Sequence, residues 1–194
     1  MHFTLADLVT DITQNGAESG ADLLELEVSE VLNSYIREFR FTVKDNGKGM
    51  TQEELKRAQD PFVTDGIKHP HRKVGLGLPF LIQTAEQSGG GWKMESVKRP
   101  LPLSGTMVSA WFDLGNVDTP PMGDIPLMFR SILLFNGPGE IVIRRIKETG
   151  EESLDYEVRK TELVEALGNL EETQSLILLG QYLNSLEEDS GEGE

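Results

Sequence analysis

The chain has 194 residues, of which 38% are hydrophobic and 26% charged. This composition excludes wholesale disorder, because it supplies a packed core, and the length fits one domain with a small addition. No run approaches the roughly 18 apolar residues that a membrane span needs, and the start MHFTLADLVTD has acids where a signal peptide has bases. The chain has no cysteine, which excludes disulfides and zinc–thiolate sites, so we expect a cytoplasmic protein.

The formal charge of −15 is unevenly spread along the chain. Residues 1–115 carry 12 basic and 16 acidic side chains, whereas residues 116–194 carry 6 and 17. A surface this acidic repels nucleic acid and anionic lipid, so we expect neither as a partner. One basic cluster, at residues 68–73, is too short for a nucleic-acid face but suits a small anion.

The spacing of apolar residues predicts the first elements in chain order. Leu5, Leu8, Val9 and Ile12 form one stripe of a helix over 4–19, with Thr4 as its N-cap. Alternation then predicts a strand at 24–28 and its hairpin partner at 35–44. Further helices are expected at 51–58, with a capping box, and at 78–88; further strands are expected at 92–97 and 106–114.

A segment rich in proline and glycine at 115–126 marks the domain boundary that we predict. It separates residues 1–115 from an α+β extension at 116–194, whose last residues, 187–194, form an acidic tail. The extension is expected to contain helices at 127–135, 161–168 and 173–186, and strands at 140–147 and 154–159. Its apolar runs require burial, and we expect them to cover the open face of the first domain's sheet.

Two glycine motifs carry the chemistry. Asp45-Asn46-Gly47-Lys48-Gly49-Met50 follows a strand, where a carboxylate and close backbone approach suit a planar base. Val74-Gly75-Leu76-Gly77-Leu78 precedes a helix, where backbone N–H groups and the helix N-terminus suit an anion. Taken singly, the first motif is more often a tight turn and the second more often a flexible loop. Neither matches a P-loop or a dinucleotide fingerprint.

The order of the motifs is more specific than either motif. Asp11 and Asn15 share one helix face at i and i+4; the two glycine motifs follow, and Ser104-Gly105-Thr106 opens a strand. In this arrangement, residues 5–114 resemble the GHKL superfamily of gyrase-type ATPases, heat-shock chaperone ATPases, histidine kinases and mismatch-repair ATPases. The resemblance implies an α+β fold of the Bergerat type: an α/β sandwich whose mixed, mostly antiparallel sheet carries helices on one face.

The resemblance also implies roles for single residues in binding ATP and Mg²⁺. Asn15 matches the magnesium ligand, and Asp45 matches the aspartate that bonds the adenine amino group. The other matches lie beside the purine or in the lid over the phosphates: Gly47, Gly49, Met50 and Thr106 near the base, and Phe62, Thr64, Gly75, Leu76, Gly77 and Leu78 in the lid. We expect residues 60–77 to form that lid.

Two departures from the family pattern leave alternatives open. Asp11 stands where ATPase members carry a general-base glutamate, so it is either a base of shorter reach, an exposed polar residue or an indirect magnesium ligand. Lys73 lies where family members have glycines before the second glycine motif. It therefore either contacts phosphate oxygens or belongs to a solvated run of charges. No histidine lies on a long amphipathic helix, and we expect no phosphoacceptor domain.

The function that we expect is ATP–Mg²⁺ binding by a regulatory or signalling protein whose ATP-site motifs are most similar to those of histidine kinases. Three classes remain open: a stand-alone kinase acting on a protein, like anti-sigma-factor kinases; an ATPase switch; and a nucleotide-binding module without turnover. A protein partner is expected at the acidic extension.

Overall fold

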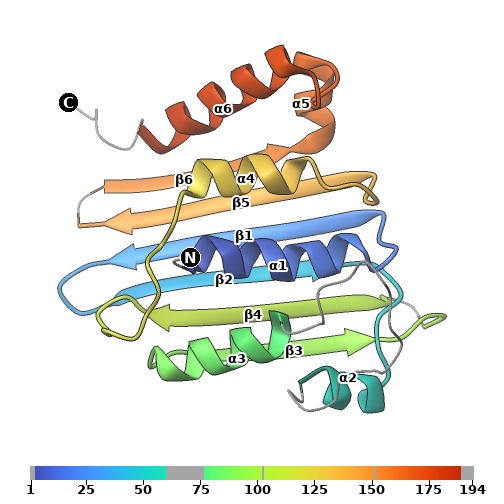
Figure 1. Ribbon diagram of the computed structural model, residues 1–194, viewed down its shortest axis with the longest axis vertical. Coiled ribbons are helices and arrows are strands. Elements are labelled where there is room, and N and C mark those ends of the chain that lie inside the picture. Colours follow the sequence, from blue (N-terminus) through green and yellow to red (C-terminus); the bar gives the residue numbers. More distant parts are fainter. Residues whose placement is uncertain (1–2, 60–76, 102, 151, 189–194) are drawn as a thin grey trace.

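The computed structural model describes residues 3–59, 77–101, 103–150 and 152–188. One six-stranded mixed sheet, in the order β3-β4-β2-β1-β5-β6, runs through it. Figure 1 shows helices on one face of this sheet, which is the α+β arrangement expected from the sequence. Among the described helices, none has the length and apolar character needed to cross a membrane.

The first helix begins as the sequence predicts. In α1 (Leu5–Ala17), Thr4 caps the N-terminus and exchanges hydrogen bonds with Asp7, a capping box. The apolar stripe of Leu5, Leu8, Val9 and Ile12 is buried against the sheet. This helix therefore presents its opposite face, with Asp11 and Asn15, to solvent.

The strands of the N-terminal half follow the predicted hairpins. β1 (Leu23–Leu32) pairs antiparallel with β2 (Arg37–Asp45), which pairs antiparallel with β4 (Gly105–Asp113), and β3 (Gly91–Val97) pairs antiparallel with β4 at the edge. Helices α2 (Gln52–Gln59) and α3 (Gly77–Gln87) complete this half. The predicted capping box of α2 is present, since Thr51 and Glu54 exchange hydrogen bonds.

The C-terminal half continues the same sheet. β5 (Glu140–Thr149) pairs parallel with β1, and β6 (Glu152–Arg159) pairs antiparallel with β5. Helix α4 (Ile125–Leu133) packs beside α1, while α5 (Lys160–Leu167) and α6 (Thr173–Glu188) follow β6. Each helix and strand that we predicted after residue 126 is present, with its ends shifted by a few residues.

The prediction that the extension covers the open face of the sheet is wrong. Its apolar strand β5 lies at the edge of β1 instead, where Ile141 and Ile143 join the core beneath the helices. The open face is charged: Lys44 pairs with Glu25, and Arg144 bridges Glu27 and Asp155. Because these side chains are solvated and paired across strands, the open face needs no cover.

Candidate functional site

Asp45 is a buried carboxylate at the last residue of β2. Its Oδ1 accepts hydrogen bonds from the Ser19 hydroxyl at 2.9 Å and from the Gly47 N–H at 2.8 Å, and the residue is only 7% exposed. Burial raises the pKa of this carboxyl, whereas the bonds from Gly47, Ser19 and Thr106 and the charge of Arg99 act in the opposite direction. The first motif therefore places a desolvated acceptor where a strand ends.

The turn that follows Asp45 requires glycine at two positions, 47 and 49. A Cβ at Gly47 would lie 1.9 Å from the Ser19 hydroxyl oxygen and 2.7 Å from Asp45 Oδ1. A Cβ at Gly49, where φ is +59°, would lie 1.8 Å from the Val97 carbonyl oxygen. The glycines thus let the backbone of residues 46–50 pack closely against β3 and the end of α1. The motif predicts such a close backbone approach.

Met50 and Thr106 are brought to the same end of the sheet through Ser96. The Ser96 hydroxyl accepts from the Met50 N–H at 2.8 Å and lies 2.9 Å from the Thr106 hydroxyl oxygen. Thr106 is also the register partner of Asp45 across β2 and β4. The predicted residues around the base are therefore neighbours in space although they are distant in sequence.

Asp11, Asn15 and Gly77 form a second group at the N-terminus of α3. A Cβ at Gly77 would lie 3.8 Å from Asp11 Cβ and 3.9 Å from Asn15 Nδ2. The first turn of α3 therefore faces the polar stripe of α1, and the positive end of its dipole points there. The Leu78 side chain packs in the core, which leaves only its backbone for a role at this end.

Helix α1 joins the two groups. Gly16 follows Asn15 directly, and a Cβ there would lie 3.7 Å from Asp45 Cβ and 2.7 Å from a methyl of Leu24. The glycine therefore seats α1 on the sheet beside Asp45, with Asn15 at the helix surface. Five residues of the predicted site fall outside the described ranges: Phe62, Thr64, Lys73, Gly75 and Leu76. The expected lid at 60–77 also falls outside them, except for Gly77.

Three residues that support the site were not singled out from the sequence. Ser19 and Ser96 supply the hydrogen bonds described above, and Arg99 donates to the Asn46 carbonyl oxygen at 3.1 Å. Ser19 follows the predicted magnesium ligand Asn15 by only four residues, so a signal existed for it. Ser96 and Arg99 carry none, because the contacts that join them to the first glycine motif, Ser96 with Met50 and Arg99 with Asn46, span more than 40 residues.

Comparison with known proteins identifies the family of the chain. A family model for histidine kinase-, DNA gyrase B- and HSP90-like ATPases matches residues 3–116. The chain belongs to this family. The prediction of a GHKL ATPase-type domain is therefore confirmed, and with it the Bergerat type of fold. ATP is the nucleotide that membership in this family implies.

Two solved structures are among those to which the chain is similar. A mycobacterial sensor histidine kinase, MprB, is 18% identical with a TM-score of 0.40, covering 56% of this chain and 69% of that one. The N-terminal domain of a DNA repair protein is 12% identical with a TM-score of 0.49, covering 86% of this chain and 57% of that one. Both scores lie below 0.5, so neither structure bears on the site. No curated protein matches the chain.

Proposed function

We propose that this protein binds ATP with Mg²⁺ and acts as a nucleotide-controlled regulatory protein. The observation that carries the proposal is the buried Asp45 carboxylate, held by Ser19 and Gly47 at a turn that only glycine permits. An anionic acceptor in this position suits the exocyclic amine of adenine. Guanine presents a carbonyl oxygen at that place, so GTP is expected to bind weakly.

The second group of residues suits the phosphates. The α3 N-terminus at Gly77 offers N–H donors beside Asp11 and Asn15. Among the described residues, no three carboxylates or histidines gather into a metal site. Proteins usually bind Mg²⁺ through one or two side chains together with phosphate oxygens, so a larger cluster is not needed. Asn15 would hold the ion, which would neutralise phosphate charge.

Calorimetry of ATP binding tests the proposal with a matched pair of variants. Asp45→Asn keeps the shape of the side chain but turns an amide N–H toward the adenine amine. We expect affinity to fall about 5- to 150-fold, the equivalent of about 1–3 kcal/mol for an unpaired buried polar group. Asp118→Asn removes the same charge from an exposed position and should bind as the wild type does. Equal ATP affinity in Asp45→Asn and the wild type would refute the assignment.

A second candidate function is ATP hydrolysis with Asp11 as general base. The closeness of Asp11 to Gly77 favours it, because a base must lie near the phosphates to activate a water molecule. Slow phosphate release that Asp11→Asn abolishes, with ATP affinity unchanged, would support it. Phosphate transfer to a mixed-in protein would support the stand-alone kinase instead. Tight binding with neither reaction would leave a nucleotide-binding module.

A further inference from the structure

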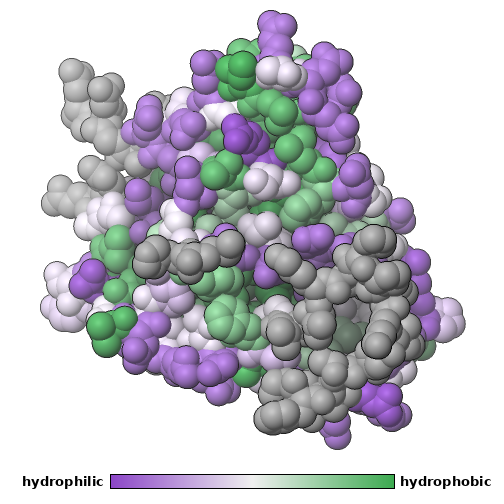
Figure 2. Space-filling model, in the orientation of Figure 1, coloured by the Kyte–Doolittle hydropathy of each residue, from purple (hydrophilic) through white to green (hydrophobic). Residues whose placement is uncertain are grey.

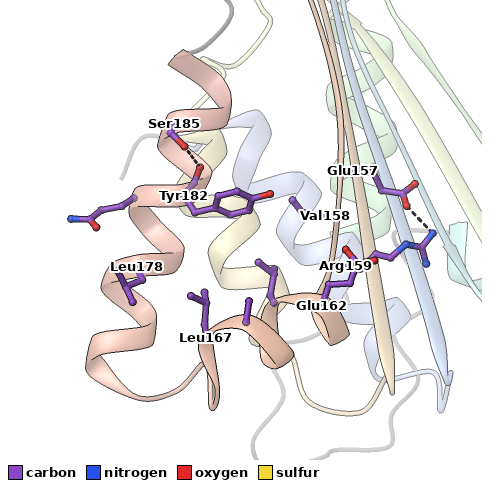
Figure 3. A pocket seen from close by; sticks show the side chains of 11 residues that line it. Glu157, Val158, Arg159, Glu162, Leu167, Leu178, Tyr182 and Ser185 are labelled. Carbon is purple, nitrogen blue, oxygen red and sulfur yellow. Dashed lines mark hydrogen bonds and ion pairs between the residues drawn. The ribbon is translucent and has the colours of Figure 1, made fainter.

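A groove of ≈ 690 Å³ lies between the end of β6, α5 and α6 (Figure 3). Its walls are largely apolar and include Val158, Leu163, Leu167 and Leu178. Figure 3 shows the Tyr182 ring reaching from α6 toward the strand. Leu178 and Tyr182 are each 43% exposed, so this apolar wall is open to solvent. Figure 2 shows apolar side chains among polar ones over the α5–α6 end.

The groove lies at the C-terminal end of an unpaired edge strand of the sheet. β6 is the last strand in the order, and among the described strands it pairs only with β5. In Figure 1, α5 and much of α6 extend past the outer edge of β6. These helices therefore overhang the place where a seventh strand would lie, with the groove beneath them. An added strand would find main-chain partners on β6 and apolar contacts on α6.

The charge around the groove indicates the kind of strand. Glu157 and Glu162 line it, and the one cation among its described lining residues, Arg159, already pairs with Glu157 at 2.7 Å. Residues 116–194 hold 17 acidic and 6 basic side chains. A second copy of the chain would bring the same acidic edge, and like charges across paired strands destabilise the pairing. The complementary occupant is a basic segment of another protein.

We propose that the edge of β6 and this groove bind an extended segment of a partner protein as a seventh strand. Alternate apolar side chains of the segment enter the groove beside Leu178 and Tyr182. Its lysine and arginine side chains meet Glu157 and Glu162. The proposal gives a chemical identity to the regulatory partner in the proposed function, yet the groove shares no residue with the nucleotide site.

Selection from a library of random dodecapeptides against the full chain tests this proposal. We expect the enriched peptides to alternate apolar residues with lysine or arginine. Their binding should fall at least roughly tenfold in Leu178→Lys, which places a charge on the apolar wall. The control is Ile177→Lys, because Ile177 lies on the same helix, is 56% exposed and does not line the groove. Circular dichroism checks that both variants fold.

Methylating the backbone nitrogens of the best peptide separates strand addition from charge attraction, because methylation removes main-chain donors and keeps every side chain. We expect it to abolish binding. Unchanged binding after methylation, peptides with helical spacing of their apolar residues, or equal binding to Leu178→Lys would each overturn the proposal. Peptide binding to Asp45→Asn without nucleotide should equal that of the wild type, so a failure at the nucleotide site does not affect this test.

Discussion

Among the residues that the structure describes, each half of the sheet buries one charged side chain, and the surroundings of the two charges differ. In the N-terminal half (β1–β4 with α1–α3), Asp45 receives hydrogen bonds from the neutral groups of Ser19 and Gly47. In the C-terminal half (β5, β6 and α4–α6), Arg145 is 1% exposed and lies between the carboxylates of Glu30 and Glu187. The first charge is left without a described ion-pair partner, whereas the second is neutralised within the fold.

This difference in how the two charges are compensated separates a candidate binding site from a structural ion-pair network. The Arg145 network also includes Tyr156, which donates to Glu187 at 2.7 Å; burial and that carboxylate raise the pKa of the tyrosine. These contacts tie the end of α6 to β5, β6 and β1, and they offer nothing to a ligand. A buried charge therefore indicates a binding site only where no charged group of the protein neutralises it, so that a ligand can supply the interaction.

The largest effect is expected from Arg145→Ala. Removing the cation takes away the positive charge that neutralises the partly buried carboxylates of Glu30 and Glu187, so the free energy of unfolding should fall by about 3–5 kcal/mol. Urea denaturation measures it. Arg144→Ala is the control, since its pairs lie on the exposed open face and should contribute about 0–1 kcal/mol. Equal losses in the two variants would remove the distinction between the two networks. ATP affinity should be unchanged in both.

Gly47→Ala should affect both stability and binding. The added methyl would overlap the Ser19 hydroxyl, so the turn must shift, at a cost of about 1–3 kcal/mol typical of overpacking. The shift also moves Asp45, and calorimetry should find weakened ATP binding. Gly139→Ala in the C-terminal half has its nearest neighbour at 3.6 Å and should leave binding unchanged. An unaltered ATP affinity in Gly47→Ala would contradict the role of this turn.

Ser19→Ala should produce a smaller loss confined to the site. The substitution removes one hydrogen bond from Asp45, worth about 0.5–1.5 kcal/mol, and ATP affinity should fall by roughly 2- to 13-fold. Ser131→Ala, which removes a hydroxyl bonded to the Leu127 carbonyl on α4, serves as the matched substitution in the other half. If both serine variants bind ATP as the wild type does, Ser19 does not position the carboxylate.

The pH dependence of stability should show the smallest effect. Because burial raises the pKa of Asp45 above 3.8, the folded state holds this proton more tightly than the unfolded state. The resulting stabilisation is present below pH 3.8 and is lost as pH rises through the raised pKa. Asp45→Asn lacks this loss, so its stability relative to the wild type should increase with pH above 3.8. A constant difference across that range would show that the pKa is not raised.

Local chemistry made much of the site predictable from the sequence. Asp45, Gly47 and Gly49 are close in the chain, and a strand followed by a glycine turn determines their arrangement. Ser96 was not predicted, because its contacts with Met50 and Thr106 depend on how β3 and β4 pair. The extension shows the same limit. Its apolar runs require burial, yet nothing local in them specifies parallel pairing with β1 rather than contact with the open face.

The parallel pairing of β1 with β5 has a consequence for synthesis on the ribosome. β1 emerges well before its parallel partner β5, which ends at Thr149. Until Thr149 has left the ribosome, the edge of β1 that pairs with β5 has no partner strand. The carbonyl groups of Pro121 and Met122, which accept hydrogen bonds from the first N–H groups of α1, are also synthesised later than α1. The nascent chain is therefore most exposed to aggregation during the interval in which residues 33–149 are being made.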